Sequence, residues 1–563
     1  MNILGLNYFY HDSSACIVKD GQLIVALEEE RFTRTKHTYL FPHQAIQRCL
    51  QQAGLKAEDL DAIAISVKPE IDWGKRARHV ATHLPRSLTL AKYEIKLYYD
   101  KMTAFSAWMN ALWPAGRKRP AVHWVPHHES HAAGTFYVSP YESAAIMSVD
   151  GSGEWASSML GVGKGNKVDF FSTSYFPNSL GSMYEAVTQY CGFQNSYDEG
   201  KTMGLAPLGD PSVFKKVVEK IVEVDGEGRI HIDQSYFNFQ YWEQRIFSEK
   251  FVAAFGAPRQ KSDVGFQKHH LDTAAAFQEV LEDKCLEVAR VLKRKTGERY
   301  LIMAGGVALN SVMNGRLIRE SEFDDLYVMP GAGDNGTSIG AAFVVWNGIH
   351  GKPRTFHHGD PYVGTSYTNE EIAKVIAECK LSAVYHENIE EVTAQFLQEG
   401  QIVAWFQGRM EIGPRALGSR SILANPTLPH MKDKINAEVK HREAFRPFAP
   451  SAIVDVKEKY FDMTVEDPFM LKVCNVLPEV RATLPAITHV DGTARLQTVR
   501  REMNQRYYDL IAAFGRLSGV PVVLNTSFNI MGEPIVEHPM QAVRCFFSTG
   551  LDILVLGNYV IRK

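Results

Sequence analysis

The stretch Ala144-Ala-Ile-Met-Ser-Val-Asp-Gly-Ser-Gly-Glu154 is an apolar run that ends in a carboxylate and a glycine-rich turn. A second run at residues 158–162 follows, and a Gly-Lys-Gly-Asn turn separates it from a third at 168–172. This pattern predicts a strand, a polar loop and a hairpin. The same order of runs and turns is found earlier in the chain, at residues 3–10, 11–14, 15–18, 20–21 and 23–27. We interpret the two stretches as an internal structural repeat.

Two more strand-loop-helix units follow the second copy of this pattern. One runs from strand 300–303 through Ala304-Gly-Gly into a helix at 307–317, and the other runs from strand 326–329 through a glycine-rich loop into a helix ending near Trp346. Strands that alternate with helices predict a layered α/β fold. Residues 348–366 are rich in Gly, Pro and His without an apolar period, which is typical of a connector between domains.

Beyond this connector the sequence predicts a second α/β unit. It has apolar periods for helices at 369–379 and 389–399 and for strands at 402–406, 520–524 and 553–556. We therefore predict a domain at residues 1–350, a linker at 351–368 and a smaller domain at 369–563.

Composition excludes several classes of protein. The 563 residues are 45% apolar and 22% charged, which indicates two or more folded domains. A net charge of -3 gives no broad basic surface for nucleic acid or an anionic membrane. The seven cysteines are scattered singly, so neither a disulfide framework nor a Cys-x-x-Cys site is indicated, and a reducing cytoplasm is the simplest location. No run approaches the roughly 20 apolar residues of a membrane helix.

Three histidines follow a predicted strand in Val125-Pro-His-His-Glu-Ser-His131. If a helix starts here, His127 and His131 lie four residues apart on one face, a spacing that suits chelation of a metal. Asp150 ends a strand and Asp334 precedes a helix, and α/β folds place their sites at such strand ends. Two histidines and two carboxylates suit iron, manganese or zinc. The alternative is that the histidines are solvated or cap the helix.

Glycine-bearing loops follow three predicted strands, at 150–154, 304–308 and 331–336. Backbone N–H groups at such glycines can approach a phosphate or an adenine closely, so the three loops together indicate a nucleotide site. Residues 198–204 lack the first glycine of a Walker A loop, which excludes a P-loop.

Fixed cations gather in the second domain and are interleaved with glycine, proline and aromatic residues. They are Arg409, Arg415, Arg420, Lys440, Arg442 and Arg446. Arginine clamps phosphates in a bidentate manner, so we interpret this stretch as a phosphate site, with a solvated basic face as the alternative. Leu524-Asn-Thr-Ser-Phe-Asn529 ends a strand with polar side chains that suit an adenine or phosphate contact, or equally an Asx or Ser turn.

Over nearly the whole chain, these motifs resemble the NodU/CmcH carbamoyltransferases, which carbamoylate hydroxyl groups of antibiotics, Nod factors and similar natural products. The segments that carry the resemblance are 11–15, 28–33 with Lys36 and His37, 126–131, 149–154, 200–206, 305–310, 413–423 and 524–529.

The resemblance implies a fold and a reaction. The N-terminal domain is expected to belong to the actin-like ATPase superfamily, with a duplicated ribonuclease-H-like fold similar to the tRNA threonylcarbamoyl-transfer protein. The C-terminal domain is expected to resemble threonylcarbamoyl-AMP synthase. It would make carbamoyl-adenylate from carbamoyl phosphate and ATP with Mg²⁺, and the N-terminal site would pass the carbamoyl group to a hydroxylated natural product or sugar.

Site residues are carried over by motif. The implied metal ligands are His127, His131, Asp150 and Asp334, with Fe²⁺ favoured and Mn²⁺ or Zn²⁺ as alternatives. The implied transfer-site residues are His11, Asp12 and Lys36. Nucleotide contacts are implied at Gly305, Gly306 and Asn310, and the adenylate-forming site is implied at Arg415, Lys440, Arg446, Arg495, Asn525 and Ser527. A cytoplasmic monomer or homodimer with no nucleic-acid or membrane partner is expected.

Three other functions compete with this interpretation. A small-molecule kinase with an actin-like fold shares the nucleotide loops but needs neither the histidine pair nor the second cationic domain. A nucleotide-dependent scaffold without chemistry is the non-enzyme alternative. A metallopeptidase is disfavoured because no glutamate stands where the H-E-x-x-H pattern requires a general base.

Overall fold

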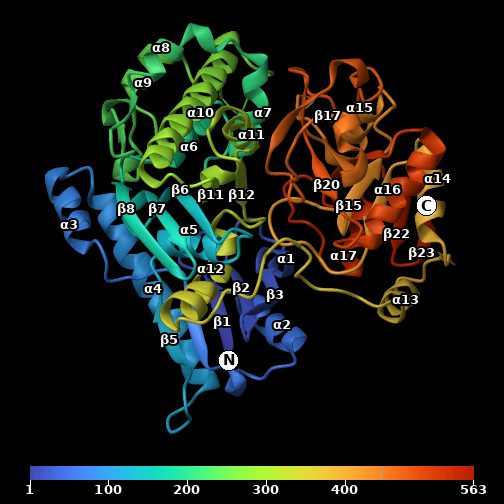
Figure 1. Cartoon of the computed structure of the whole chain (residues 1–563), viewed down its shortest axis with the longest axis horizontal. Coiled ribbons are helices and arrows are strands. Elements are labelled where there is room, and N and C mark those ends of the chain that lie inside the picture. The colour runs from blue at the N-terminus through green and yellow to red at the C-terminus, as the bar shows by residue number, and fades with distance from the viewer. Residues whose placement is uncertain (261, 444) are drawn as a thin grey trace. The chain divides into compact units, whose positions relative to one another are not determined.

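The computed structural model describes residues 1–260, 262–443 and 445–563. The chain forms two compact units (Figure 1). The first unit comprises Met1–Glu29 and His37–His358, and the second comprises Glu30–Lys36 and Gly359–Lys563. The chain passes between them within the predicted connector, and the short segment Glu30–Lys36 packs with the second unit, which its position in the sequence does not predict.

The first unit contains two five-stranded sheets of the same topology. The first sheet has the order β3-β2-β1-β4-β5, formed by Gln22–Glu28, Ser14–Lys19, Asn2–Asn7, Ala62–Ile65 and Ala121–Trp124. The second has the order β8-β7-β6-β11-β12, formed by Lys167–Tyr175, Ala156–Lys164, Ser143–Gly153, Tyr300–Ala304 and Asp325–Val328. In each sheet the first three strands are antiparallel and the last two run parallel to the middle strand. The predicted repeat is therefore confirmed.

Two helices lie between these sheets. Helix α5 (His127–Tyr137) packs on β6, β7 and β11, helix α12 (Thr337–Phe343) packs on β1, β2 and β4, and the two helices pack on each other (Figure 1). Every residue of α12 is buried, and so is every residue of α5 except Glu129. Their contact is formed at glycines, because a Cβ on Gly134 would lie 2.2 Å from the Cα of Gly340. The two sheets are therefore joined through α5 and α12, whose backbones touch at these glycines.

Replacing Gly340 with alanine is expected to destabilise the first unit. The new Cβ would lie 1.9 Å from the backbone oxygen of Ser130, so α5 and α12 would have to separate. Overpacking of this kind costs about 1 to 3 kcal/mol, measurable as a lower free energy of unfolding in urea. Gly74→Ala is the matched control, because a Cβ there meets nothing within 4 Å. Equal stability of Gly340→Ala and the parent would contradict the close contact.

Three further helices pack on strands of the second sheet, namely α6 (Leu180–Tyr190), α10 (Lys268–Thr296) and α11 (Ser311–Glu320). Helix α7 (Glu199–Leu205) packs on α6 and α10. Helices α3 (Trp73–Thr82) and α4 (Leu88–Leu112) form an insertion between β4 and β5. In the part of the chain that the structure describes, no helix is both long and apolar enough to cross a membrane.

The end of the first unit caps helix α5. The guanidinium of Arg354 donates to the backbone oxygens of Phe136 at 2.9 Å, Tyr137 at 3.1 Å and Tyr141 at 2.8 Å. The last carbonyls of a helix lack partners within it, and a cation there also complements the helix dipole. Residues before His358 are thus fastened to the first unit, although the sequence predicts only a connector.

The second unit is built on a mixed eight-stranded sheet of order β13-β23-β22-β14-β15-β21-β16-β20. The strands are Val384–Tyr385, Tyr559–Arg562, Ile553–Leu556, Val403–Phe406, Arg420–Ala424, Val522–Ser527, Ala449–Ile453 and Gln497–Val499. The helices are α13 (Asn369–Glu378), α14 (Ile389–Gln398), α15 (Met431–Ile435), α16 (Gln505–Ser518) and α17 (Pro539–Phe547). A small sheet is formed by β17 (Phe461–Asp462), β18 (Val473–Val476) and β19 (Thr493–Arg495).

Strand β14 shows why this sheet is central to the second unit. Ala404 and Phe406 face one apolar cluster and Val403 and Trp405 face another, so both faces of the sheet are covered. This is the burial expected of an apolar run without polar alternation. The predicted α/β class is confirmed, whereas the likeness of this unit to threonylcarbamoyl-AMP synthase stays a prediction.

Candidate functional site

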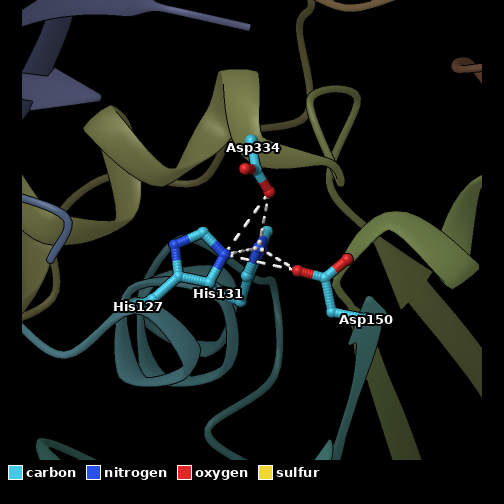
Figure 2. A group of neighbouring side chains, drawn as sticks. All are labelled: His127, His131, Asp150 and Asp334. Atoms are coloured by element: carbon cyan, nitrogen blue, oxygen red, sulfur yellow. Dashed lines mark hydrogen bonds and ion pairs between the residues drawn. The ribbon is translucent and has the colours of Figure 1, made fainter. Parts of the chain in front are cut away.

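Four side chains predicted to bind a metal meet where α5, the end of β6 and the loop before α12 converge (Figure 2). One donor atom of each residue lies within 4.8 Å of all the others. The Nε2 atoms of His127 and His131 are 3.1 Å apart, and each lies 3.3 to 3.4 Å from Asp150 Oδ2 and 3.4 Å from Asp334 Oδ1. All four residues are buried. The structure thus brings together residues that are up to 207 positions apart in the sequence.

This arrangement fits a divalent metal ion. Bonds of about 2.0 to 2.1 Å to four tetrahedral ligands place the ligand atoms about 3.3 to 3.4 Å apart, close to the separations found here. Imidazole nitrogens with carboxylate oxygens suit iron, manganese or zinc. In addition, two buried carboxylates facing each other require a positive charge between them.

Neighbouring groups hold the four donors in place. Asp150 Oδ1 accepts a hydrogen bond from the Gly306 N–H at 2.9 Å, which turns Oδ2 toward the histidines. The carboxylate of Glu154 accepts the His127 N–H at 3.1 Å and so caps the start of α5. A Cβ on Gly153 would lie 2.1 Å from the His127 ring. Outer contacts of this kind fix the orientation of metal ligands.

The histidines and aspartates of the cluster shift each other's pKa values. Burial alone would lower the pKa of His127 and His131, but the carboxylates of Asp150 and Asp334 raise both pKa values. The same contacts hold the pKa of Asp150 and of Asp334 below the ordinary value, although burial opposes this. Protons on the histidines therefore supply the positive charge wherever a metal ion does not.

A second cluster surrounds Asp12. His37 Nδ1 lies 2.7 Å from Asp12 Oδ1 and His11 Nδ1 lies 3.0 Å from Asp12 Oδ2, and the His11 side chain is 44% exposed. Burial would lower the pKa of His11, but the negative charges of Asp334 and Asp12 raise it. The cluster therefore offers a partly exposed imidazole held by a carboxylate, a usual arrangement for proton transfer.

A single amide ties the two clusters together. Asn7 Nδ2, which is fully buried, donates to the backbone oxygens of His11 at 3.0 Å, Asp12 at 3.1 Å and Asp334 at 2.9 Å. Sequence reasoning missed Asn7, Glu154 and the role of His37. The one signal was a polar Asn at the end of the apolar first strand.

The structure places the remaining transfer-site candidate in the second unit. Lys36 belongs to the segment Glu30–Lys36, and its charge contributes to lowering the pKa of Lys440 there, after burial and Arg442. His37, the next residue, belongs to the first unit with His11 and Asp12.

The candidate nucleotide residues surround the end of β11. Gly305 has φ +90°, and a Cβ there would lie 2.2 Å from the Val149 backbone oxygen, so only glycine fits. Gly306 contacts Asp150 as described. The amide of Asn310 exchanges hydrogen bonds with Gln278 at 2.9 and 3.0 Å, and its Oδ1 accepts the Met313 N–H that starts α11. Asn310 thus has a local role as a helix cap, and its contact with a nucleotide stays a prediction.

The second unit contains a cluster of cations. Arg415 and Arg495 each have a buried Nε without a hydrogen-bond partner in the described chain. Burial, together with the charges of Arg495 and Arg446, lowers the pKa of Arg415 well below its usual range, and burial lowers the pKa of Arg495 to about 10. Burial and the charge of Arg446 also lower the pKa of Arg442 to about 9. A bound anion would offset the repulsion among these cations.

Strand β21 supports this cluster. Lys440 Nζ donates to Asn529 Oδ1 at 2.8 Å and to the backbone oxygen of Ser527, and the Ser527 hydroxyl donates to Asn529 Oδ1 at 2.6 Å. Asn525 Nδ2 instead donates to the backbone oxygen of Ala416 at 3.1 Å, next to Arg415. Lys440 and Ser527 thus lie together, whereas Asn525 holds the loop that carries Arg415.

Two arginines of the predicted cationic stretch serve the fold. Arg420 is fully buried and donates to the backbone oxygens of Gln407 at 2.6 Å and Thr365 at 3.3 Å. Arg409 donates to the backbone oxygen of Val363 at 2.8 Å. Composition alone does not distinguish these two arginines from Arg415.

Comparison with known proteins gives one consistent result. Two family models match the chain, the carbamoyltransferase N-terminus over residues 2–343 and the carbamoyltransferase C-terminus over residues 394–563. The chain is 37% identical to nodulation protein NolNO of Sinorhizobium fredii, over 99% of this chain and 80% of that protein. It is 38% identical to an uncharacterised protein of Synechocystis sp., over 100% of this chain and 97% of the other. It is 33% identical to the 3'-hydroxymethylcephem-O-carbamoyltransferase of Amycolatopsis lactamdurans, over 64% of each. The resemblance carried by the sequence motifs is thereby confirmed, and this chain belongs to the carbamoyltransferase family.

Proposed function

We propose that this carbamoyltransferase is ATP-dependent and works in two steps, one in each unit. The second unit makes carbamoyl-adenylate from carbamoyl phosphate and ATP with Mg²⁺, and the first unit transfers the carbamoyl group to a hydroxyl of a natural product or sugar. The observation that carries the proposal is the cluster of half-buried cations around Arg415, whose mutual repulsion the phosphates of a nucleotide would offset. The relatives named for nodulation and for a cephem support a hydroxylated small-molecule acceptor.

The first step joins carbamate to the α-phosphate of ATP and releases pyrophosphate. Water cleaves carbamoyl phosphate to carbamate and phosphate, a carbamate oxygen then bonds to the α-phosphorus of ATP, and the bond to the β-phosphate oxygen breaks to release pyrophosphate. Arg415, Arg495 and Lys440 would hold the phosphate oxygens, where fixed cations stabilise the charge that develops in phosphoryl transfer.

The second step is carbamoyl transfer in the first unit. The acceptor hydroxyl loses its proton to His11 as its oxygen bonds to the carbamoyl carbon, and the bond from that carbon to the AMP oxygen breaks. His127, His131, Asp150 and Asp334 would hold a divalent ion, Fe²⁺ foremost, that stabilises negative charge on the carbonyl oxygen and on the leaving phosphate. The nucleotide would approach the backbone at Gly305 and Gly306, which carry no side chain; their N–H groups already donate to the backbone oxygen of Ala332 and to Asp150.

Asp12 and the metal ligands set the protonation of His11. Asp12 holds the ring through Nδ1 at 3.0 Å, so Nε2 is left to meet the acceptor. The negative charge of Asp334 raises the pKa of His11. A cation bound to Asp334 would offset that charge, and the pKa of His11 would fall toward neutrality, where a general base works best.

His11→Asn is expected to slow transfer and spare adenylate formation. Loss of a positioned base costs about 10² to 10⁴ in rate, whereas pyrophosphate release occurs in the other unit. Single turnovers with preformed carbamoyl-adenylate isolate the transfer step. His231→Asn is the control, because His231 is exposed and pairs with Asp225 at 3.2 Å. A transfer rate within about threefold of the parent is too small a loss for a base, and His11 would then only cap its loop.

A further inference from the structure

The segment Glu30–Lys36, which comes from the N-terminal part of the sequence, packs within the second unit. Its first four residues form the short helix α1 (Glu30–Thr33). Arg31 is only 3% exposed, forms an ion pair with Glu30 at 3.0 Å, and donates from Nη2 to the backbone oxygen of Gly413 at 2.9 Å. Gly413 has φ +101° and stands two residues before Arg415. Arg31 therefore anchors the start of the loop that carries Arg415.

Arg34 fastens a second loop of the same unit. Its guanidinium donates to the backbone oxygens of Pro534 at 2.6 Å and Ile535 at 2.8 Å. Ile535 packs against Ala416, the neighbour of Arg415, in a small apolar cluster. In the same loop, the backbone oxygen of Glu533 accepts a hydrogen bond from Asn529 Nδ2 at 2.6 Å.

Asn529 links this second loop to the cation cluster. Its Oδ1 accepts the Lys440 ammonium at 2.8 Å. Arg31 and Arg34, from one seven-residue segment, thus hold two loops next to the cation cluster. One loop carries Arg415, and the other contacts Asn529. A guanidinium suits this task because its rigid fork can bond several carbonyls at once.

We propose that Arg31 and Arg34 are positioning residues of the adenylate-forming site, so that the first half-reaction depends on a segment from the N-terminal sequence. The inference rests on the proposed function of the second unit. Their proposed role is to hold these loops in place and not to touch the substrate. Each acts through a loop, Arg31 through Gly413 and Arg34 through residues 533–535.

The test uses the full chain with Arg31→Ala, Arg31→Lys and Arg34→Gln. Carbamoyl-phosphate-dependent pyrophosphate release from ATP is expected to fall about 10- to 100-fold in Arg31→Ala and Arg34→Gln, because misplacement of a binding group by about 1 Å can cost that much. The KM for ATP should rise and kcat should fall together. Arg31→Lys keeps the charge beside Glu30 and one donor, and should recover part of the loss.

Transfer from preformed carbamoyl-adenylate separates positioning from a general loss of structure. It should stay within about threefold of the parent in all three variants, since a global defect would slow both steps alike. Arg48→Ala is the matched control, because Arg48 lies on the next helix, α2 (His43–Ala53), which belongs to the first unit, and donates to Gln51 at 2.8 Å. It should keep both rates.

Two results would overturn the proposal. One is pyrophosphate release within twofold of the parent in both Arg31→Ala and Arg34→Gln. The other is an equal loss in both half-reactions with a lowered melting temperature, which would mark the segment as a general support of the fold. Arg34→Gln is informative even where Arg31→Ala does not fold, because the Arg34 side chain is 20% exposed. A parent enzyme that releases no pyrophosphate would instead refute the proposed function.

Discussion

Arg415→Ala is expected to abolish carbamoyl-adenylate formation and leave the protein at least as stable as the parent. The Arg415 guanidinium faces other cations, which together with burial lower its pKa. Removing one partner of a desolvated charge contact costs about 2 to 5 kcal/mol, or about 30- to 5000-fold in rate. Removing a half-buried charge that faces other cations is not expected to weaken the fold. Pyrophosphate release and the free energy of unfolding check the two parts.

A matched arginine shows whether charge alone explains the loss. Arg500 lies in the same unit, but it is exposed and paired with Glu466 at 2.5 Å. Exposed ion pairs contribute little, so Arg500→Ala is expected to keep the parent rate. An Arg415→Ala enzyme that released pyrophosphate as fast as the parent would show that the cluster does not hold the nucleotide.

His127→Ala or Asp334→Ala is expected to remove the bound metal. The cluster would supply four ligands from three elements, and metal sites that lose even an outer contact weaken about 10- to 100-fold. A lost ligand should therefore cost at least as much. Metal content after dialysis, measured by elemental analysis, checks this. His123→Ala, on β5 just before α5, is the control and should retain the metal. A full equivalent of tightly bound ion in either ligand variant would refute the ligand set.

Metal binding is also expected to release protons. The carboxylates of Asp150 and Asp334 raise the pKa values of His127 and His131 against the effect of burial, so a metal ion that binds these nitrogens should displace protons. Metal affinity should therefore rise with pH until the pH exceeds the raised pKa values of the two histidines. Titration calorimetry in buffers of different ionisation enthalpy counts the protons. Binding without proton release would contradict the charge assignment.

The same pKa shifts predict the stability of the metal-free protein. Histidines with a raised folded pKa contribute stability that is fully present below about pH 6.5 and is lost as pH rises through the folded value. Asp150 and Asp334, with lowered pKa values, contribute stability that is present above about pH 4 and is lost on acidification. The ion-paired cluster should therefore stabilise the metal-free protein most between these limits.

Local patterns were sufficient to predict much of the fold and part of the site. The apolar runs at 3–10 and 144–149 predict the two repeated sheets, because strand burial and hairpin turns are local properties. His127 and His131 follow from helical spacing, and Asp150 and Asp334 from their places at strand ends. These predictions depend on only a few neighbouring residues.

What the sequence did not show are partners far apart along the chain. Asn7 joins the His11 loop to Asp334, and Arg31 reaches Gly413, across 327 and 382 positions. No periodicity encodes such contacts. Arg420 and Arg415 likewise look alike in a basic stretch, and only the carbonyl partners of Arg420 show that it serves the fold.

Product analysis of the nucleotide tests two-step carbamoyl transfer most directly. The parent enzyme is mixed with ATP, Mg²⁺ and carbamoyl phosphate without an acceptor, and the nucleotides and phosphates are separated. The expected result is pyrophosphate together with carbamoyl-AMP or its breakdown product AMP, only when carbamoyl phosphate is present. Formation of ADP would indicate a kinase, and unchanged ATP would indicate a scaffold. Either outcome would contradict adenylate formation by the second unit.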